Sequence, residues 1–261
     1  LFKITMAITT INLYISFLRT KLFYVEIIIM YKNKRILAFI PARGGSKGLP
    51  NKNILDLCGK PLLCHSIDVA KNCSYIDDII VSTDSSEIKD IAEFYGATVP
   101  FLRPDELSSD TATIIDAMFY TLQRLMKEDV TYDYIMLLQP TQPLRKAEFL
   151  EEAIELIIDN DHPSLVSVSP VLEHPILMRT VDKTGALCSL LSTSSTVRRQ
   201  DFSPVYKVNG SIYINRIDST FTNSTSLNDN LYPYFMDNTY DIDIDSAEDL
   251  EKAREVLSFF N

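Results

Sequence analysis

A glycine-rich loop directly after an apolar run is the first feature of this chain that suggests chemistry. Residues 36–53 have the sequence ILAFIPARGGSKGLPNKN, which includes the cations Arg43, Lys47 and Lys52. Glycines let a backbone turn through conformations closed to other residues and bring its N–H groups close to a ligand. Because the N–H groups and the cations both favour negative charge, the loop is predicted to bind an anion, and phosphate is the natural candidate.

The glycine spacing excludes two well-known phosphate loops, since a P-loop needs GxxxxGK followed by Ser or Thr and a dinucleotide loop needs GxGxxG. The alternative is that the cations are merely solvated, as isolated surface charges usually are. We favour binding because the loop follows a buried strand and would face a crevice. Arg43 and Lys47 are predicted to neutralise a polyphosphate, with Lys52 and Asn53 steadying it.

An acidic segment near the C-terminus, DIDID at residues 241–245, is the second candidate. Alternation would put Asp241, Asp243 and Asp245 on one side of an extended chain, where they repel unless a cation lies between them. Mg²⁺ typically uses one or two carboxylates together with substrate phosphates. The alternatives are a solvated strand edge or a helix N-cap. Beside a polyphosphate loop, metal binding is the better interpretation.

The rest of the chain alternates short β-rich runs with longer helical ones, which is typical of a parallel sheet flanked by helices. The predicted strands cover residues 36–40, 78–82, 98–102, 134–138, 165–169 and 210–214. The predicted helices cover residues 61–71, 83–95, 110–127, 146–158 and 246–259. Ligands of such folds bind beyond the carboxyl ends of the strands. The polar clusters that follow the first four strands would therefore share one crevice.

Length and composition predict one α/β domain with an appendage. The chain has 261 residues, of which 46% are hydrophobic and 23% charged, so it can bury a sizeable core. Residues 170–206 are predicted to form an excursion. The apolar run at residues 4–18 is shorter than the roughly 20 residues of a spanning helix. We interpret residues 1–29 as an extension ahead of a functional protein at 30–261, with an anchoring or packing helix as the alternative.

Charge and cysteine content exclude some classes of protein. The formal net charge of −10 argues against a general nucleic-acid binder, which usually carries a basic face. The cysteines form no CxxC pair or metal-ligand spacing, so reduced thiols and a cytoplasmic location are expected. We expect no stable membrane association.

Six motifs occur in an order and spacing that are specific to one family. They are IPARGGSKGLPNKN, VSTD, RPDELSSDTA, LLQPTQPLR, NGSIYI and DIDS. Over about residues 35–257 the chain resembles the acylneuraminate cytidylyltransferases, also called CMP-sialic acid synthetases. The resemblance implies a Rossmann-like α/β nucleotidyltransferase fold, with a mainly parallel sheet flanked by helices. It also implies a homodimer, whose protruding dimerisation element would be residues 170–206.

The resemblance further implies that CTP and a nonulosonic acid give a CMP-sugar and pyrophosphate, with Mg²⁺. The triphosphate would be held by Arg43, Lys47, Lys52 and Asn53. The cytosine and ribose would be surrounded by Arg103 and the segment Ser109, Asp110 and Thr111. The acceptor sugar would be bound by Gln139, Arg199 and Lys207, with Arg199 on its carboxylate. The metal would be held by Asp243 and Asp245. The catalytic residues would be Lys47, Arg43 and Asp245, which would neutralise the charge that develops as pyrophosphate leaves.

Departures from the family pattern leave the sugar open. Lys207 stands where sialic-acid members place an Arg shortly before NG, and Lys cannot make the same bidentate contact with a carboxylate. Ile114 stands where some members have Ser. Sialic, legionaminic and pseudaminic acids all remain candidates. A sugar-1-phosphate nucleotidyltransferase and a nonenzymatic nucleotide sensor are the alternative functions, and Arg103 or Arg199 could instead serve in surface ion pairs or stay solvated.

Overall fold

The computed structural model describes residues 30–45, 48–109, 111–191, 196 and 198–260. The predicted N-terminal extension at 1–29 lies outside these residues, as do Lys47 and Asp110. Within the described part of the chain, no helix is long and apolar enough to cross a membrane.

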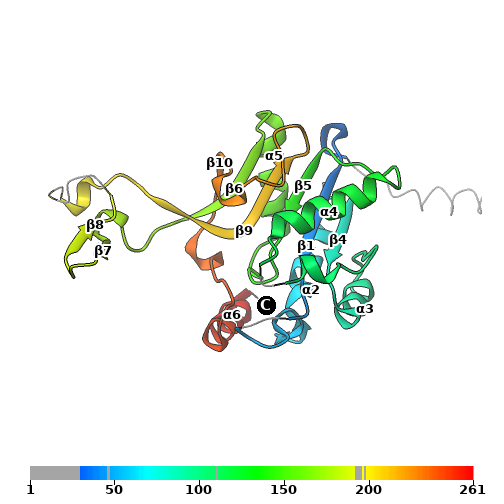
Figure 1. Cartoon of the computed structure of the whole chain (residues 1–261), viewed down its shortest axis with the longest axis horizontal. Helices are drawn as coiled ribbons and strands as arrows, with labels where there is room; N and C mark the ends of the chain where they lie inside the picture. The colour runs from blue at the N-terminus through cyan, green and yellow to red at the C-terminus, as the bar shows by residue number, and fades with distance from the viewer. Residues whose placement is uncertain (1–29, 46–47, 110, 192–195, 197, 261) are drawn as a thin grey trace, which may run out of the picture.

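A mixed, mainly parallel six-stranded sheet forms the centre of the molecule (Figure 1). Its strand order is β10-β6-β9-β5-β1-β4, and only β9 runs antiparallel to its neighbours. The strands are β1 (Ile36–Pro41), β4 (Asp78–Ser82), β5 (Tyr134–Leu137), β6 (Ser164–Pro170), β9 (Tyr206–Arg216) and β10 (Tyr232–Phe235). Parallel pairing of β1 with both β4 and β5 confirms the predicted fold class.

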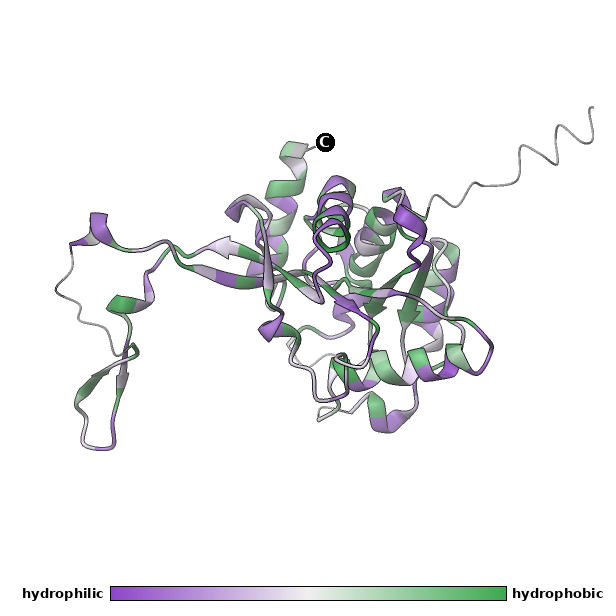
Figure 2. Ribbon diagram, turned by 90° about the horizontal axis from the view of Figure 1, so that it is seen from above, coloured by the Kyte–Doolittle hydropathy of each residue, from purple (hydrophilic) through white to green (hydrophobic). Residues whose placement is uncertain are grey.

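Helices cover both faces of this sheet, as the 3.6-residue periodicity predicts. They are α2 (Leu62–Asn72), α3 (Ser86–Phe94), α4 (Ile114–Met126) and α5 (Ala147–Asp159), whereas α6 (Ala247–Phe260) packs on a separate small core. Alternate residues of β1 face opposite layers: Ile36 and Ala38 pack with residues of α2, α3 and α5, whereas Leu37 and Phe39 pack with residues of α4. Burial on both faces explains why the central strands are continuously hydrophobic (Figure 2).

A separate small core fixes the acidic segment and the last helix. Ile244 is fully buried with Leu57 and Leu62, beside Leu250 and Ala253 of α6. The two-stranded hairpin β2 (Asp56–Leu57) and β3 (Lys60–Pro61) belongs to the same region. This packing places the C-terminal segment next to the glycine-rich loop, although nearly 200 residues separate them in sequence.

A projecting arm carries the predicted excursion away from the sheet (Figure 1). It contains the hairpin of β7 (Arg179–Val181) and β8 (Leu187–Ser189) and the short 3₁₀ helix η5 (Arg199–Asp201). The side chains of β7 and β8 are exposed along their whole length. The strands β6 and β9 form its root, since their pairing continues to Pro170 opposite Tyr206.

Three parts of the sheet differ from the sequence-based expectation. The predicted strand at 98–102 is wrong: only Thr98 forms an isolated bridge, to Ile80, because Pro100 has no N–H with which to extend the ladder. The strand predicted at 210–214 is longer and antiparallel, and β10 was not predicted because its alternation is weak. Outside the sheet, the segment 241–245 forms no strand, and its isoleucines face a core as the alternation predicts.

Candidate active site

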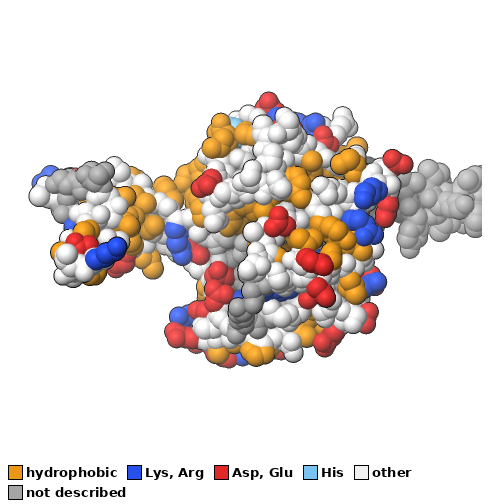
Figure 3. Space-filling model, viewed as in Figure 1, with side chains coloured by type: hydrophobic (Ala, Val, Ile, Leu, Met, Phe, Trp, Pro, Cys, Tyr) orange, Lys and Arg blue, Asp and Glu red, His pale blue; other side chains and the backbone are white. Residues whose placement is uncertain are grey.

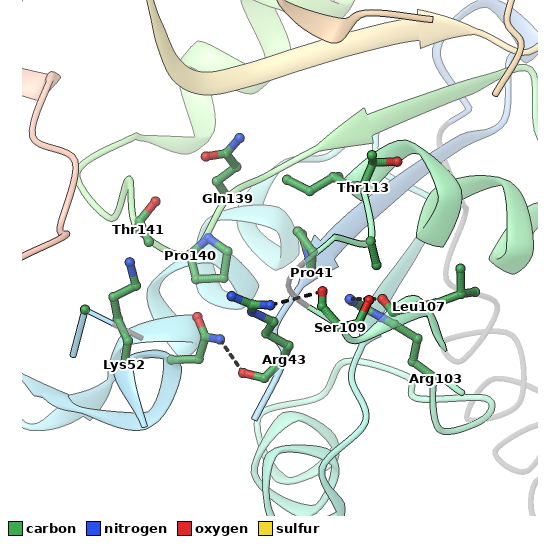
Figure 4. Close-up of a pocket in the computed structure, with 14 residues that line it drawn as sticks. Pro41, Arg43, Lys52, Arg103, Leu107, Ser109, Thr113, Gln139, Pro140 and Thr141 are labelled. Carbon is green, nitrogen blue, oxygen red and sulfur yellow. Dashed lines mark hydrogen bonds between the residues drawn. The ribbon is translucent and has the colours of Figure 1, made fainter. Parts of the chain in front are cut away.

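The carboxyl ends of β1, β4 and β5 meet around a cavity of about 380 Å³. We call this cavity the loop pocket, because the glycine-rich loop forms one wall (Figure 4). The remaining walls come from the segment after η3 (Asp105–Leu107) and from the turn after β5. The lining residues are Pro41, Arg43, Gly48, Lys52, Asn53, Arg103, Leu107, Ser109, Ala112, Thr113, Ile114, Gln139, Pro140 and Thr141. Residues from the first, third and fourth of the predicted polar clusters therefore share this cavity, whereas Ser82, Thr83 and Asp84 are not among its lining residues.

Contacts within the glycine loop and with two other segments hold it in shape. The backbone N–H of Gly44 donates to Asp84 Oδ1 at 2.8 Å, and Asn53 Nδ2 donates to the Arg43 carbonyl at 3.0 Å. At Gly48 a Cβ would lie only 3.0 Å from the Asp245 carbonyl oxygen. Gly48 thus allows a close approach of two backbones, and Asn53 supports the loop while also lining the cavity.

Two predicted cations, Arg43 and Lys52, line the loop pocket. Arg43 Nη1 donates to the carbonyl of Ser109 at 3.2 Å, across the cavity from its own loop (Figure 4). Lys52 Nζ lies 2.8 Å from Asp245 Oδ1. The cavity therefore brings together two groups suited to phosphate oxygens, and one of them already contacts a predicted metal ligand.

Arg103 lines the same cavity but makes buried contacts of its own. Its side chain donates to Ser82 Oγ, to the Ser82 carbonyl at 2.6 Å and to the Leu107 carbonyl at 3.3 Å. Burial lowers the pKa of its guanidinium from the ordinary value. Arg103 thus connects Leu107 of η3 to the end of β4. These contacts with protein carbonyls fix its place in the wall of the cavity.

The segment after η3 is only partly in the pocket. Ser109 lines the loop pocket, and its hydroxyl lies 3.2 Å from Thr111 Oγ1. Thr111 is exposed and does not appear among the lining residues. Thr113 caps α4 with a reciprocal capping box to Asp116, which fixes the start of that helix beside the cavity.

A second cavity of about 370 Å³ adjoins the first and shares Gln139 with it. We call it the strand pocket, because the first half of β9 forms one wall. It is lined by Gln139, Gln142, Lys207, Val208, Asn209, Gly210, Tyr213, Asn228, Asp241 and Asp243. The predicted acceptor residues Gln139 and Lys207 therefore lie together in a polar cavity next to the loop pocket.

The acidic segment links the two cavities. Asp241 and Asp243 line the strand pocket, and Asp241 Oδ2 lies 3.0 Å from Lys207 Nζ. Asp245 instead pairs with Lys52 of the loop pocket. The predicted alternation holds, because Ile242 and Ile244 pack into the small core on the opposite side. Asp241 and Asp243 thus face the strand pocket, whereas Asp245 faces the loop pocket.

Asp243 and Asp245 fit a divalent cation as a pair. Burial raises the pKa of the Asp243 carboxyl, the hydroxyl of Thr141 lowers it, and the negative charge of Asp245 raises it further. The negative charges of the two carboxylates therefore repel each other, and a bound cation would reduce this repulsion. Among the described residues no group of three or more His, Cys, Asp or Glu side chains could hold a metal. The remaining ligands would have to come from substrate and water, as is usual for Mg²⁺.

Arg199 belongs to the projecting arm, where it begins η5. Its predicted contact with a substrate carboxylate stays a prediction.

Sequence reasoning overlooked three residues of the turn after β5. Arg145 is 3% exposed and donates to the carbonyls of Gln139 and Ser211, both at 2.6 Å, which ties this turn to β9. Burial lowers its pKa to about 9. Thr141 contacts Asp243, and Gln142 lines the strand pocket. The motif LLQPTQPLR contained all three, but only the tertiary contacts separate their roles.

A cationic cavity at the strand ends, next to a polar cavity and a carboxylate pair, defines the class of protein. The first half of the site suits a polyphosphate and the second suits a hydroxylated acceptor, with the acidic segment between them. On the fold and the site together, this is a nucleotidyltransferase.

Comparison with known proteins makes the assignment specific. A family model described as cytidylyltransferase matches residues 37–258, and the chain belongs to this family. It is 40% identical to the CMP-N,N'-diacetyllegionaminic acid synthase of Legionella pneumophila, over 82% of this chain and 93% of that protein. It is 32% identical to a pseudaminic acid cytidylyltransferase of Campylobacter jejuni, over 84% of this chain and 94% of that protein.

The chain is also similar to a longer cytidylyltransferase and to a solved structure. The chain is 37% identical to an N-acylneuraminate cytidylyltransferase of Streptococcus agalactiae over 82% of its own length, but it spans only 51% of that protein. Among solved structures, a CMP:2-keto-3-deoxy-manno-octonic acid synthetase complexed with CTP superposes with a TM-score of 0.65 at 19% identity, covering 87% of this chain and 100% of that one. At this identity the structural match supports the fold alone.

Proposed function

We propose that this enzyme transfers CMP from CTP to a nonulosonic acid, a nine-carbon 2-keto acid of the sialic, legionaminic or pseudaminic type. The observation that carries the proposal is the pair of adjoining cavities that share Gln139. The names of the relatives supply the substrate class, because three of them act on acids of this kind. CTP would occupy the loop pocket and the acid the strand pocket. The cytoplasm, where CTP is available, is the proposed location.

In the proposed reaction, the anomeric hydroxyl oxygen of the acid attacks the α-phosphorus of CTP, and the hydroxyl proton passes to solvent water. The bond from that phosphorus to the oxygen bridging to the β-phosphorus breaks, and pyrophosphate leaves with the electron pair. Arg43 and Lys52 would bind the triphosphate and spread the charge of the leaving group, a role we also assign to Lys47. Holding both substrates in line across Gln139 would supply the orientation.

Mg²⁺ is the proposed cofactor, with Asp243 and Asp245 as its protein ligands. When bound, it would neutralise phosphate charge and polarise the α-phosphate. The protein's own part is to keep the ligands in place: Thr141 bonds Asp243, and burial of Ile244 anchors the segment between the two carboxylates. Lys52, which pairs with Asp245, would turn toward the phosphates once CTP binds.

A homodimer is proposed from the projecting arm. The arm and its root carry exposed apolar side chains, which gather on the part of the surface drawn at the left of Figure 3. They include Leu172 at 89% exposure, Leu187 at 72% and Val181 at 67%. Apolar groups exposed at this density mark an association surface. A second copy of the chain could cover them and bring an arm, with its Arg199, to the strand pocket.

Product analysis tests the enzymatic proposal. The full chain is incubated with CTP, Mg²⁺ and each of three nonulosonic acids, and CMP-sugar and pyrophosphate are measured. Formation of both from at least one acid is expected. Turnover with a hexose 1-phosphate and none with any nine-carbon 2-keto acid would overturn the proposal in favour of a sugar-1-phosphate nucleotidyltransferase.

The arm has a test of its own. The double variant V181S/L187S removes apolar surface without touching either pocket, so sedimentation should shift toward the monomer. The variant R199A should raise the KM for the acid more than the KM for CTP. An unchanged sedimentation coefficient in the double variant would contradict the proposed interface.

A further inference from the structure

Two buried amides line the strand pocket, and they differ in their hydrogen bonding. Asn209 is 4% exposed, and its Oδ1 accepts from Ser167 Oγ at 2.5 Å and from the Ser211 backbone N–H at 3.1 Å. Its Nδ2 donates to Ser169 Oγ at 2.8 Å. Gln142 is 2% exposed, yet its Oε1 has no hydrogen-bond partner among the described residues. Only the first amide has its oxygen paired within the described part of the chain.

A buried amide oxygen without a partner is unfavourable, because it has given up water without gaining another donor. Native structures satisfy most such groups, so each exception needs an explanation. Gln142 lies in the turn after β5, where the Gln142 N–H donates to the carbonyl of Gln139 at 3.2 Å. This turn forms the boundary of both cavities, so the unpaired oxygen belongs to the site and not to a remote part of the core.

Gly210 of β9 lies close to the side chains of Gln142 and Gln139. Gly210 has φ of +76°, a conformation that favours glycine, and a Cβ built there would lie 3.8 Å from Gln142 Nε2 and 3.6 Å from Gln139 Oε1. The register of β6 and β9 shifts between Val166 and Val168, so β9 bulges at this point and passes over both glutamines. Bulges of this kind commonly aim side chains at a site.

The charges around the strand pocket decide which part of an acceptor would meet this oxygen. Asp241 and Asp243 line the same cavity and would repel a substrate carboxylate. Lys207, the cation of the lining, is already within 3.0 Å of Asp241. Gln142 Oε1 accepts hydrogen bonds and cannot donate them. This wall therefore suits a ring substituent that carries an N–H or O–H group, rather than the carboxylate end of the acid.

We propose that Gln142 is a specificity-determining residue, whose Oε1 accepts a hydrogen bond from an acylamino N–H or a hydroxyl of the acceptor sugar. The assignment rests on the proposed function, because it places the sugar in the strand pocket. A substrate with the donor completes the hydrogen bonding of Gln142. A substrate without it leaves the oxygen buried and unpaired, which is the situation in which polar sites discriminate strongly.

The test replaces each amide by leucine, which keeps a comparable size and removes the polar atoms. Q142L should lower kcat/KM for the best acid about 10-fold, the worth of one hydrogen bond to substrate, and change the KM for CTP by less than about twofold. Its Tm should stay equal or rise, because an unpaired polar group has been removed. N209L is the matched control, and its Tm should fall because the serines that bond Asn209 lose their partner.

Substrate analogues separate the two possible donors. One analogue replaces the acylamino nitrogen by an ester oxygen, and another lacks a ring hydroxyl. The analogue that lacks the relevant donor should cost the wild type about 10-fold in kcat/KM and should cost Q142L nothing further. If every analogue affects the wild type and Q142L equally, the proposed contact does not exist.

The outcomes distinguish this proposal from the function on which it rests. A wild-type enzyme that makes no CMP-sugar from any acid overturns the proposed function and this contact with it. A wild type that is active, with Q142L equally active toward its acid, overturns the contact alone. A fall in the Tm of Q142L as large as that of N209L would make Gln142 structural and would also overturn it.

Discussion

The loop pocket and the strand pocket adjoin each other but are built in different ways. The loop pocket takes Arg43, Lys52 and their supporting Asn53 from one continuous loop after β1. The strand pocket assembles the turn after β5, the first half of β9 and the acidic segment, which are distant in sequence. The first cavity is cationic, whereas the second is a mixture of amides and carboxylates around one lysine.

Under the proposed function, this difference would separate the recognition of CTP from the recognition of the acid. A triphosphate is common to every reaction with CTP and can be held by charge from a local loop. An acceptor sugar is recognised by the positions of its polar substituents, and these positions depend on how three segments pack together. Changes in the loop pocket should therefore alter the KM for CTP, and changes in the strand pocket the KM for the acid. The acidic segment contributes to both.

The largest effect is expected at Asp245, which joins the two cavities. D245N should lower kcat at saturating substrates about 100-fold and weaken the dependence on Mg²⁺, because one of the two proposed metal ligands is lost. Its side chain is 75% exposed, so the Tm should hardly change.

E248Q is the matched control for this variant. Glu248 is an exposed acid of α6 that pairs with Lys252 at 2.8 Å, outside both cavities, so the control should keep full activity. Full activity of D245N over the whole range of Mg²⁺ concentrations would show that the metal assignment is wrong.

A smaller effect, confined to the nucleotide, is expected from Lys52. K52A should raise the KM for CTP about 10-fold, the usual scale for one charge-assisted contact, and leave the KM for the acid within about twofold. Steady-state kinetics with each substrate varied in turn provide the measurement. K60A serves as the control, since Lys60 lies on the small hairpin and pairs with Asp68 away from the cavities. Equal effects of K52A on both KM values would contradict the proposal that the loop pocket binds CTP and the strand pocket binds the acid.

The smallest effect is expected from Lys207. K207A should raise the KM for the acid about fivefold with little change for CTP, because half of the lysine side chain is exposed and water screens its charge. Its Tm should fall, since the Asp241 side chain is 5% exposed and would lose its only described cation.

The double variant K207A/D241N separates stability from binding. Removal of the buried charge should restore the Tm but not the KM for the acid. If the KM recovers together with the Tm, Lys207 acts by holding Asp241 and does not contact the substrate.

The fold class followed from the sequence because each central strand is continuously apolar and each helix carries one apolar face. The predicted helices and the strands at β1, β4, β5 and β6 agree with the structure to within a few residues. The third predicted strand failed because Pro100 stops the ladder after one bridge. The direction of β9 could not be predicted, since pairing depends on neighbours that are distant in sequence.

The candidate site was predictable where a motif holds both the ligand group and its support, as at Arg43 and Asn53. It was less predictable where neighbours are non-local. Arg103 was expected at the nucleotide, and it does line the loop pocket, but carbonyls of Ser82 and Leu107 occupy much of its guanidinium. The burial of Gln142 could not be predicted from its own motif, because it depends on the approach of Gly210 in β9, which is distant in sequence.

The sequence by itself determined the family, the glycine loop with its cations, and the alternation that turns Asp241, Asp243 and Asp245 away from the core. These are local properties of residue type and spacing. Only the tertiary structure decided that Asp245 meets Lys52, that Asp241 meets Lys207 and that Gln142 is buried without a partner. Such pairings depend on which distant segments the sheet and the small core bring together, and hydrogen bonds and charges act only over those short distances.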